Sequence, residues 1–163
     1  MPSSRRRPPN SAARFDSLEQ EVFLNVWRTY DRLRVLEDEL FAQFDLTPQQ
    51  YNALRLLRAA HPESIPTLQL ADRLVSRAPD ITRLLDKLEA RQLIQRDRLA
   101  SNRRVVEVRI AAAGIRLLDE IAGPLQECHR RQLGHLPAGK LRALGQLLRD
   151  ARRPHESAQG HWS

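Results

Sequence analysis

The chain has a single cysteine, Cys128, so no disulfide can form within it and a reducing, cytoplasmic setting is expected. It has only six glycines, which are scattered and leave no glycine-rich loop to cradle a phosphate. No apolar run approaches the roughly 18 residues of a membrane span. The basic start, "MPSSRRRPPNSAARF", is not followed by the apolar stretch of a secretory signal. These absences predict a globular cytoplasmic protein without a membrane partner.

Patterns typical of catalysis and metal binding are missing as well. An enzyme would need clustered His, Cys or carboxylate side chains, and the five histidines all lie outside residues 65–110. Cys128 and His135 are seven residues apart and share a helix face. Two ligands are too few for a structural zinc site, and no Cys-x-x-Cys or His-x-x-x-His pair accompanies them. We therefore expect no enzyme activity, no metal and no cofactor.

Positive charge, in contrast, is abundant. Lys and Arg total 27 against 20 Asp and Glu, which gives a net charge of +7 and a pI near 10.8. Of the 27, only Lys87 and Lys140 are lysine, so 25 are arginine. Arginine suits bidentate contacts with phosphates and base edges, which favours a nucleic-acid partner. A GC-rich genome, which enriches arginine in every protein, is the alternative explanation.

A long helix is expected near the N-terminus, after a disordered basic tail at residues 1–16. It begins at Ser17, because "SLEQ" has the form of a capping box with Gln20 at the third helical position, and it spans about 28 residues. Its two apolar stripes exceed what a small domain can bury, so part of it is expected to face a second chain. The stripes are Leu18, Val22, Val26, Tyr30, Leu33, Leu40 and Phe44, and Phe23, Trp27 and Phe41.

Three further helices are predicted before residue 93. Thr47 as N-cap, Pro48 and Gln50 mark the start of one in "DLTPQQYNALRLLRAA". A short helix is expected from Thr67, followed by a strongly amphipathic one in "SRAPDITRLLDKLEARQ". The inward face of the amphipathic helix consists of Ile81, Leu84, Leu85 and Leu88.

The periodicity then changes to that of strands. "LIQRDRL" and "VVEVRI" alternate and predict a hairpin with a longish loop between its strands. Val106, Val108 and Ile110 share one strand face. Residues 112–153 return to helix, interrupted or bent at Gly123-Pro124, and residues 154–163 are expected to be a disordered tail.

Two short helices, a tight turn and a hairpin in residues 65–110 have the order of a winged helix-turn-helix. The second helix would lie in the major groove of DNA, where side chains near its N-terminus meet base edges. Free amides near Ser76–Pro79 would meet a phosphate, and a hairpin arginine could enter the minor groove. The outward residues of the helix are Asp80, Thr82, Arg83, Asp86, Lys87 and Arg91.

Residues 46–118 resemble the MarR family of bacterial winged-helix transcription regulators. The matching pieces are "LTPQQYNALRLL", "LADRL", "ITRLLDKLEARQLIQR" and "NRRVVEVRIAAAGIRLL". The flanking helices, 17–44 and 112–153, resemble that family's dimerisation region. The fold class implied is mainly α with a small β-wing: one domain, 17–153, whose winged helix DNA-binding region is 46–110.

The resemblance implies a homodimeric repressor that binds a pseudo-palindromic operator in double-stranded DNA, with recognition helices in major grooves about 34 Å apart. It implies Arg103 in the minor groove, Arg83 with Thr82 at bases or backbone, and Thr67, Ser76 and Arg77 at phosphates. Release by a small aromatic effector is also implied, with Trp27 and Tyr30 as candidate pocket residues. The expected DNA-binding set is Thr67, Ser76, Arg77, Asp80, Thr82, Arg83, Lys87, Arg103 and Arg104.

Three positions depart from the family pattern. Asn102 stands where an aspartate commonly holds a neighbouring arginine, so we expect a hairpin tip that is mobile without DNA. Ala111 replaces a threonine N-cap, at a cost of roughly 1 kcal/mol. Gln92 stands where glycine is common at a helix end.

Other interpretations stay open. The long helices could form a protein-protein interaction module without sequence-specific DNA binding. Cys128 could make the protein a redox-responsive regulator, if His129, Arg130 and Arg131 lower the pKa of its thiol. A small core or interface residue is the simpler interpretation of Cys128. Trp27 and Tyr30 could likewise serve core or dimer packing instead of a ligand.

Overall fold

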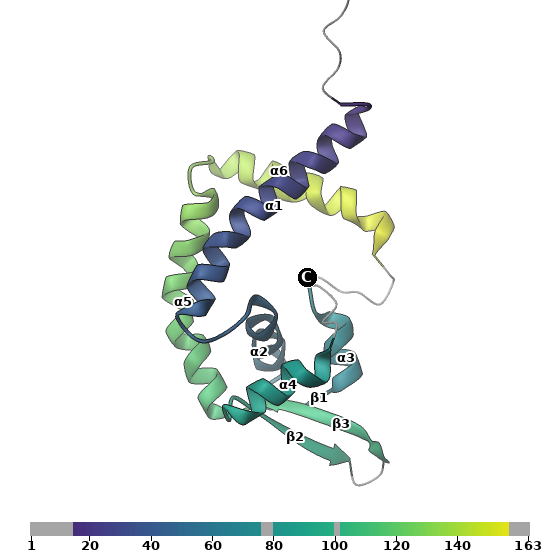
Figure 1. Cartoon of the computed structure of the whole chain (residues 1–163), viewed down its shortest axis with the longest axis vertical. Helices are drawn as coiled ribbons and strands as arrows, with labels where there is room; N and C mark the ends of the chain where they lie inside the picture. The colour runs from purple at the N-terminus through teal and green to yellow at the C-terminus, as the bar shows by residue number, and fades with distance from the viewer. Residues whose placement is uncertain (1–14, 76–79, 100–101, 157–163) are drawn as a thin grey trace, which may run out of the picture. The chain divides into compact units, whose positions relative to one another are not determined.

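The computed structural model describes residues 15–75, 80–99 and 102–156. Six α-helices, three strands and a short 3-10 helix occupy these ranges, and the arrangement is mainly α with a small antiparallel sheet, as predicted (Figure 1). The elements are α1 Leu18–Ala42, α2 Pro48–Ala60, β1 Ile65–Pro66, α3 Thr67–Arg73, α4 Ile81–Ala90, β2 Ile94–Leu99, β3 Asn102–Ile110, α5 Ala112–Leu133, α6 Ala138–Arg152 and η1 Arg153–His155.

Side-chain caps fix the starts of the first two helices. The Thr47 hydroxyl accepts from the Gln50 amide at 3.2 Å, and the Gln50 side chain accepts from the Thr47 amide at 2.8 Å. This reciprocal pair is the capping box expected from the sequence. At α1, Ser17 Oγ accepts from the Gln20 amide at 3.1 Å, but the Gln20 side chain reaches the amide of Asp16.

The sheet has the strand order β1-β3-β2, and both pairings are antiparallel. Ile65 in β1 lies opposite Val108, and Ile94 in β2 lies opposite Ile110. The sequence missed β1, because a strand of two residues shows no periodicity. The predicted longish loop was also wrong: β2 ends at Leu99 and β3 already begins at Asn102. Backbone pairing extends the hairpin through residues whose side chains carry no apolar alternation.

One hydrophobic core joins α2, α3, α4, α5 and the sheet. Its fully buried side chains come from every one of these elements, so α4 and the hairpin share a single packed support. The predicted inward residues of α4 behave as expected, except that Ile81 is only half-buried. The largest fully buried side chains are Phe41, Leu54, Leu57, Leu70, Leu85, Leu88, Ile94, Val108 and Ile121.

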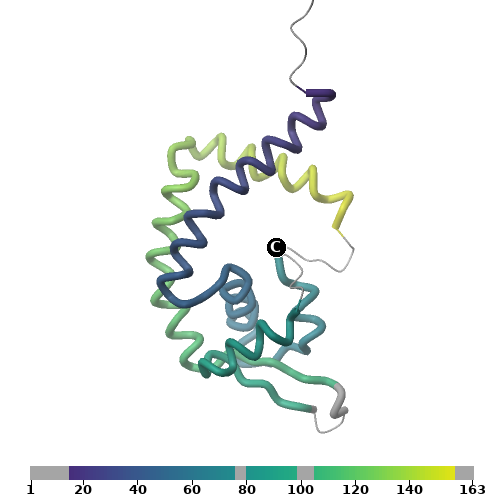
Figure 2. Tube along the Cα trace, in the orientation of Figure 1, coloured from purple at the N-terminus to yellow at the C-terminus, as the bar shows by residue number. Residues whose placement is uncertain are grey.

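The helices after the sheet differ from expectation in two places. α5 runs unbroken through Gly123 and Pro124, so the expected interruption does not occur (Figure 2). Ile121 and Leu125, on either side, are buried, and this packing holds the helix together where Pro124 lacks an amide donor. The chain beyond α6 forms the 3-10 helix η1, so the segment expected to be a disordered tail begins with local structure.

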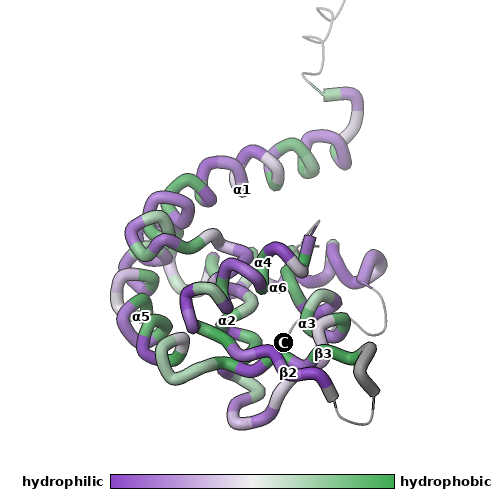
Figure 3. Tube along the Cα trace, turned by 60° about the horizontal axis from the view of Figure 1, so that its bottom comes forward, coloured by the Kyte–Doolittle hydropathy of each residue, from purple (hydrophilic) through white to green (hydrophobic). Residues whose placement is uncertain are grey.

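Two compact units make up the chain, one up to Val35 and one from Leu36 onward. The described part of the N-terminal unit is mainly the first part of α1, where hydrophobic and hydrophilic residues alternate along the helix (Figure 3). Its large apolar side chains are exposed, in line with the expectation that this helix has more to bury than one chain provides. They include Leu18, Val22, Phe23, Val26, Trp27 and Tyr30.

Candidate nucleic-acid interface

Helix α4 presents the polar face expected of a recognition helix. Thr82, Arg83 and Lys87 are exposed, while Leu84, Leu85 and Leu88 on the opposite face are buried. Among the residues that the structure describes, neither the Arg83 guanidinium nor the Lys87 ammonium has an ion-pair partner. Both cations are therefore available to a negatively charged ligand. The helix lies beside the hairpin of β2 and β3 (Figure 1).

Asp80, expected among the DNA-contacting residues, has a structural role at the start of this helix. Its Oδ1 accepts from the backbone amide of Arg83 at 2.9 Å, which makes it the N-cap of α4. An ionised carboxylate at this position satisfies a free helix amide and interacts favourably with the helix dipole. A phosphate would not gain the Arg83 amide while Asp80 holds it. The amides expected to bind a phosphate, near Ser76–Pro79, lie outside the described residues.

Asp86 is on the outward face, as predicted, but its charge is paired. Arg96, on β2, donates from Nη2 to Asp86 Oδ1 at 2.6 Å and from Nε to Glu89 Oε2 at 2.9 Å. The hydrogen bond with Glu89, followed by that with Asp86, holds the pKa of Arg96 above its ordinary value. Arg96 thus fastens β2 to α4 and neutralises two carboxylates of the recognition helix. Nothing in the sequence pattern indicated this pairing.

Arg91, expected to face outward, is half-buried and turned toward the end of α1. Its guanidinium donates to the carbonyl oxygen of Phe44 at 3.1 Å and to that of Asp45. These carbonyls follow the last turn of α1, where helix carbonyls lack intrahelical partners. The expectation of an outward Arg91 was therefore wrong. The backbone leaves the helical direction after Ala90, because Gln92 has a left-handed φ of 58°.

The hairpin that follows α4 carries the wing arginines. Arg103 and Arg104 belong to strand β3, near its start, and Asn102 lies opposite Leu99. The side chains of residues 99–104 are outside the described part, so the expected mobility of this tip stays a prediction. Farther along the hairpin, Arg109 pairs with Asp97 at 3.1 Å.

Among the residues expected at phosphates, Thr67 is described and Ser76 and Arg77 are not. The Thr67 hydroxyl donates to the carbonyl oxygen of Val106 at 3.0 Å, so its proton is used within the protein and joins α3 to β3. A second side-chain hydrogen bond between elements was not expected from the sequence. The side chain of the buried residue Asn52, on α2, accepts from the backbone amide of Val75 through Oδ1 at 3.1 Å. It holds the chain where α3 leads toward α4.

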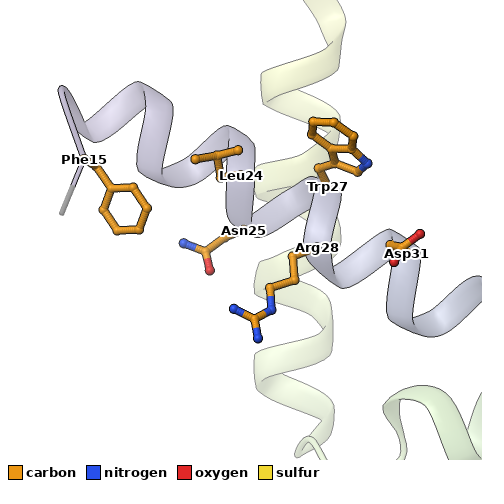
Figure 4. Close-up of a pocket in the computed structure, with 6 residues that line it drawn as sticks. All are labelled: Phe15, Leu24, Asn25, Trp27, Arg28 and Asp31. Atoms are coloured by element: carbon orange, nitrogen blue, oxygen red, sulfur yellow. The ribbon is translucent and has the colours of Figure 1, made fainter.

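The candidate ligand residues lie on the N-terminal unit. Trp27 lines a hollow of about 490 Å³, together with Phe15, Leu24, Asn25, Arg28 and Asp31 (Figure 4). Tyr30 is exposed but does not line it. The hollow offers aromatic and aliphatic surface beside one guanidinium, one amide and one carboxylate, that of Asp31.

Cys128 is buried in α5, and its surroundings are unlike those of a reactive thiol. Burial, followed by the nearby carboxylate of Glu37, raises the pKa of Cys128, and Arg131 only partly opposes this. The expectation that its neighbours could lower the pKa was therefore wrong. Across the described ranges, no group of three or more His, Cys, Asp or Glu side chains could hold a metal ion. Nor does any helix described there have the length and apolar character needed to cross a membrane.

Comparison with known proteins gives one consistent result. The family model described as MarR family matches residues 46–106. The crystal structure of a MarR transcription factor from Planctomyces limnophilus is 56% identical, covers 83% of this chain and 98% of its own, and superposes with a TM-score of 0.67. The HTH-type transcriptional regulator MhqR of Bacillus subtilis is 29% identical over 101 residues, which are 62% of this chain and 68% of that protein.

A further similar structure belongs to a protein whose DNA binding a small molecule regulates. The structure of Bordetella bronchiseptica BpsR, whose DNA binding is regulated by 6-hydroxynicotinic acid, is 21% identical with a TM-score of 0.69 and covers 83% of this chain and 95% of its own. At that identity the likeness shows the fold alone. The 56% identity over almost the whole length of the Planctomyces protein shows the family. With its winged helix and its exposed recognition-helix cations, this chain is a DNA-binding transcription regulator, not an enzyme, and it belongs to the MarR family.

Proposed function

We propose that the protein is a homodimeric repressor that binds a pseudo-palindromic operator through α4 and the β2–β3 hairpin, and that a small aromatic ligand releases it. The observation that carries the DNA-binding part is the exposed face of α4, where Arg83 and Lys87 have no ion-pair partner in the described chain. Uncompensated cations on a helix supported by a rigid core match the charge of the duplex and the width of its major groove.

Each residue has a distinct role in this proposal. Arg83 and Thr82, on the first turns of α4, contact base edges or nearby phosphates, and Lys87 contacts the backbone. Arg103 enters the flanking minor groove, with Arg104 beside it. Thr67, Ser76 and Arg77 lie along the phosphates, and Asp80 supports the site by capping α4. Because the Thr67 hydroxyl donates to Val106, its phosphate contact would run through its backbone amide.

The test is to select bound sequences from random duplex DNA and then to measure affinity for the selected operator. Arg83→Ala and Arg103→Ala should each weaken binding by about 1–3 kcal/mol and reduce the salt slope by about one phosphate or less. Arg131→Ala, which removes an exposed arginine outside residues 65–110, is the control and should bind like the wild type. Unchanged affinity in both test variants would refute the site. Absence of any selected sequence would favour the protein-protein interaction module.

The release part of the proposal rests on the hollow around Trp27. The DNA binding of BpsR is regulated by an aromatic acid, 6-hydroxynicotinic acid. Here Arg28 would pair with the carboxylate of such a ligand, and the apolar lining residues, Trp27 and Phe15 among them, would border its ring. Tyr30, one turn from Trp27, would border the bound ligand.

Fluorescence of Trp27 tests this part. A Trp162→Phe variant leaves Trp27 as the only tryptophan, and its emission should change on titration with 6-hydroxynicotinic acid or related aromatic acids. Arg28→Gln should weaken the response, and the same ligand should lower operator affinity. A ligand that changes the emission without changing operator affinity would separate binding from release and remove the regulatory role.

A further inference from the structure

The recognition helix carries as many acidic as basic side chains, which is unexpected for a surface that meets DNA. Between Ile81 and Ala90 the basic residues are Arg83 and Lys87, and the acidic residues are Asp86 and Glu89. Residues three and four apart on a helix are neighbours, so Asp86 is within reach of Arg83. Left alone, Asp86 would pair with Arg83 and repel the DNA backbone.

In the structure Asp86 turns to another partner. Arg96, whose side chain is 22% exposed, binds both Asp86 and Glu89, which are 55% and 40% exposed. A single guanidinium has enough donors, in a fixed planar arrangement, to hold two carboxylates at once. Arg83 remains without an ion-pair partner among the described residues.

The position of Arg96 makes this arrangement stable. It lies on β2 opposite Val108, a fully buried residue of the central strand β3. Its backbone is therefore anchored in the sheet, and its guanidinium reaches across to the two carboxylates of α4. The salt bridges span ten residues for Asp86 and seven for Glu89, so they depend on the packing of α4 against β2.

We propose that Arg96 is a positioning residue for DNA binding, which masks Asp86 and Glu89 and so leaves Arg83 free for the operator. Arg96 itself does not contact DNA; it acts through Asp86. The inference rests on the proposed function, because it takes Arg83 as the residue that meets the operator. It adds a requirement: the cations of α4 bind DNA only while the carboxylates between them are neutralised by the sheet.

The experiment is a rescue series on the selected operator, with affinity and its salt dependence measured for folded proteins. Arg96→Met should weaken binding by about tenfold or more, since two carboxylates then face the duplex. Asp86→Asn in the Arg96→Met background should restore affinity to within about threefold of the wild type, and Asp86→Asn alone should change little. Urea unfolding of the same variants separates the two effects, because a change in stability that leaves the protein folded does not lower its operator affinity.

Two results would overturn the inference. One is an Arg96→Met protein that binds as tightly as the wild type, and the other is a double variant that stays as weak as Arg96→Met. If Arg96→Met does not fold, the variant Arg96→Met/Asp86→Asn/Glu89→Gln has neither the cation nor the carboxylates and should bind nearly like the wild type. Weak binding by that folded variant would also overturn it.

The same assay separates this inference from the proposed function. If the wild type selects no sequence, or if Arg83→Ala binds like the wild type, the proposed function fails. If Arg83→Ala weakens binding while Arg96→Met does not, the operator site stands and only the masking role of Arg96 is lost.

Discussion

Gln92 occupies a backbone conformation that side chains rarely adopt. Its φ is 58°, its amide donates to Glu89 at 2.7 Å, and the next amide, of Leu93, donates to Leu88 at 3.0 Å. This pair of bonds is a Schellman motif, in which glycine is the usual residue at the left-handed position. Gln92→Gly should therefore stabilise the protein by about 0.5–1 kcal/mol in urea unfolding. It relieves backbone strain of roughly 1–2 kcal/mol, and part of this gain is offset because glycine loses more conformational entropy on folding.

Gln92→Ala is the matched control. Alanine removes the same side chain but keeps the Cβ that causes the strain, so it should leave stability nearly unchanged. A stabilisation by alanine equal to that of glycine would mean that the glutamine side chain, and not its backbone conformation, is the unfavourable feature. Protein concentration has to be the same throughout, because an associating protein gains stability with concentration.

Cys128 should be slow to react with iodoacetamide in the folded protein. Only the thiolate reacts, and burial together with Glu37 raises the pKa of this thiol. The native alkylation rate at neutral pH should be at least about tenfold below that of the unfolded chain. The same shift predicts that stability is intact below the unfolded thiol pKa and falls as pH rises above it, because the unfolded state then loses its proton first. Rapid native alkylation would restore the redox-responsive interpretation.

Single residues also show how far local sequence signals reach. The capping box of Thr47 and Gln50 was predictable, because its partners are three residues apart. The partners of Arg91 are 46 and 47 residues away, and nothing in a local pattern indicates them. A helical wheel predicts an outward Arg91, because it shows only the periodicity of its own helix. Contacts made by tertiary packing decide where a long flexible side chain goes.

At the scale of elements, α5 begins without a side-chain cap. Ala111 occupies the N-cap with extended backbone angles, φ −90° and ψ 163°, and makes no side-chain hydrogen bond to the helix. Serine or threonine in this conformation can accept from an amide of the first turn. Ala111→Ser should therefore raise the free energy of unfolding by about 1 kcal/mol.

Ala112→Ser is the control for this change. Position 112 is already helical and exposed, so serine there can only lower helix propensity, by up to about 0.5 kcal/mol. The two substitutions introduce the same hydroxyl one residue apart. A stabilising Ala111→Ser and a destabilising Ala112→Ser would together place the N-cap of α5 at position 111. Equal effects of the two would contradict the N-cap at Ala111.

Most helices were predictable from their apolar spacing, and the exceptions have physical causes. α4 follows the pattern i, i+3, i+4, i+7 and was identified together with its buried face. β1 pairs only two residues with β3, so its existence depends on a strand more than 40 residues away. Pro124 predicts an interruption from local geometry, and buried neighbours on both sides override it. In both cases tertiary packing, which local sequence patterns do not show, decides the structure.

At the scale of the whole molecule, the described residues leave apolar surface uncovered on the first and the last α-helix. In the N-terminal unit, Trp27 is 61% exposed, and its ring centroid lies 6.2 Å from that of Phe23, which is exposed as well. In the C-terminal unit, α6 has no buried residue although Leu144, Leu147 and Leu148 face one side of it. Exposed apolar faces of this kind mark association surfaces. They support the proposed homodimer and the assignment of the flanking helices to it.

Leu147→Glu should weaken the proposed dimer. Leu147 is 67% exposed in the single chain, so a glutamate there can stay in water in the monomer and loses hydration only on association. The dissociation constant should rise by at least about thirtyfold, or roughly 2 kcal/mol, as measured by analytical ultracentrifugation. Operator affinity should fall with it, because two recognition helices bind jointly only when they are linked.

Gln146→Glu is the matched control, since it adds the same charge one residue away, on the polar side of α6 beside Arg149 and Asp150. It should leave the dissociation constant within about threefold of the wild type. If both variants dissociate equally, net charge and not the apolar face governs association. If the wild type is itself a stable monomer at micromolar concentration, the dimer proposal fails, and each winged helix would have to bind its half-site alone.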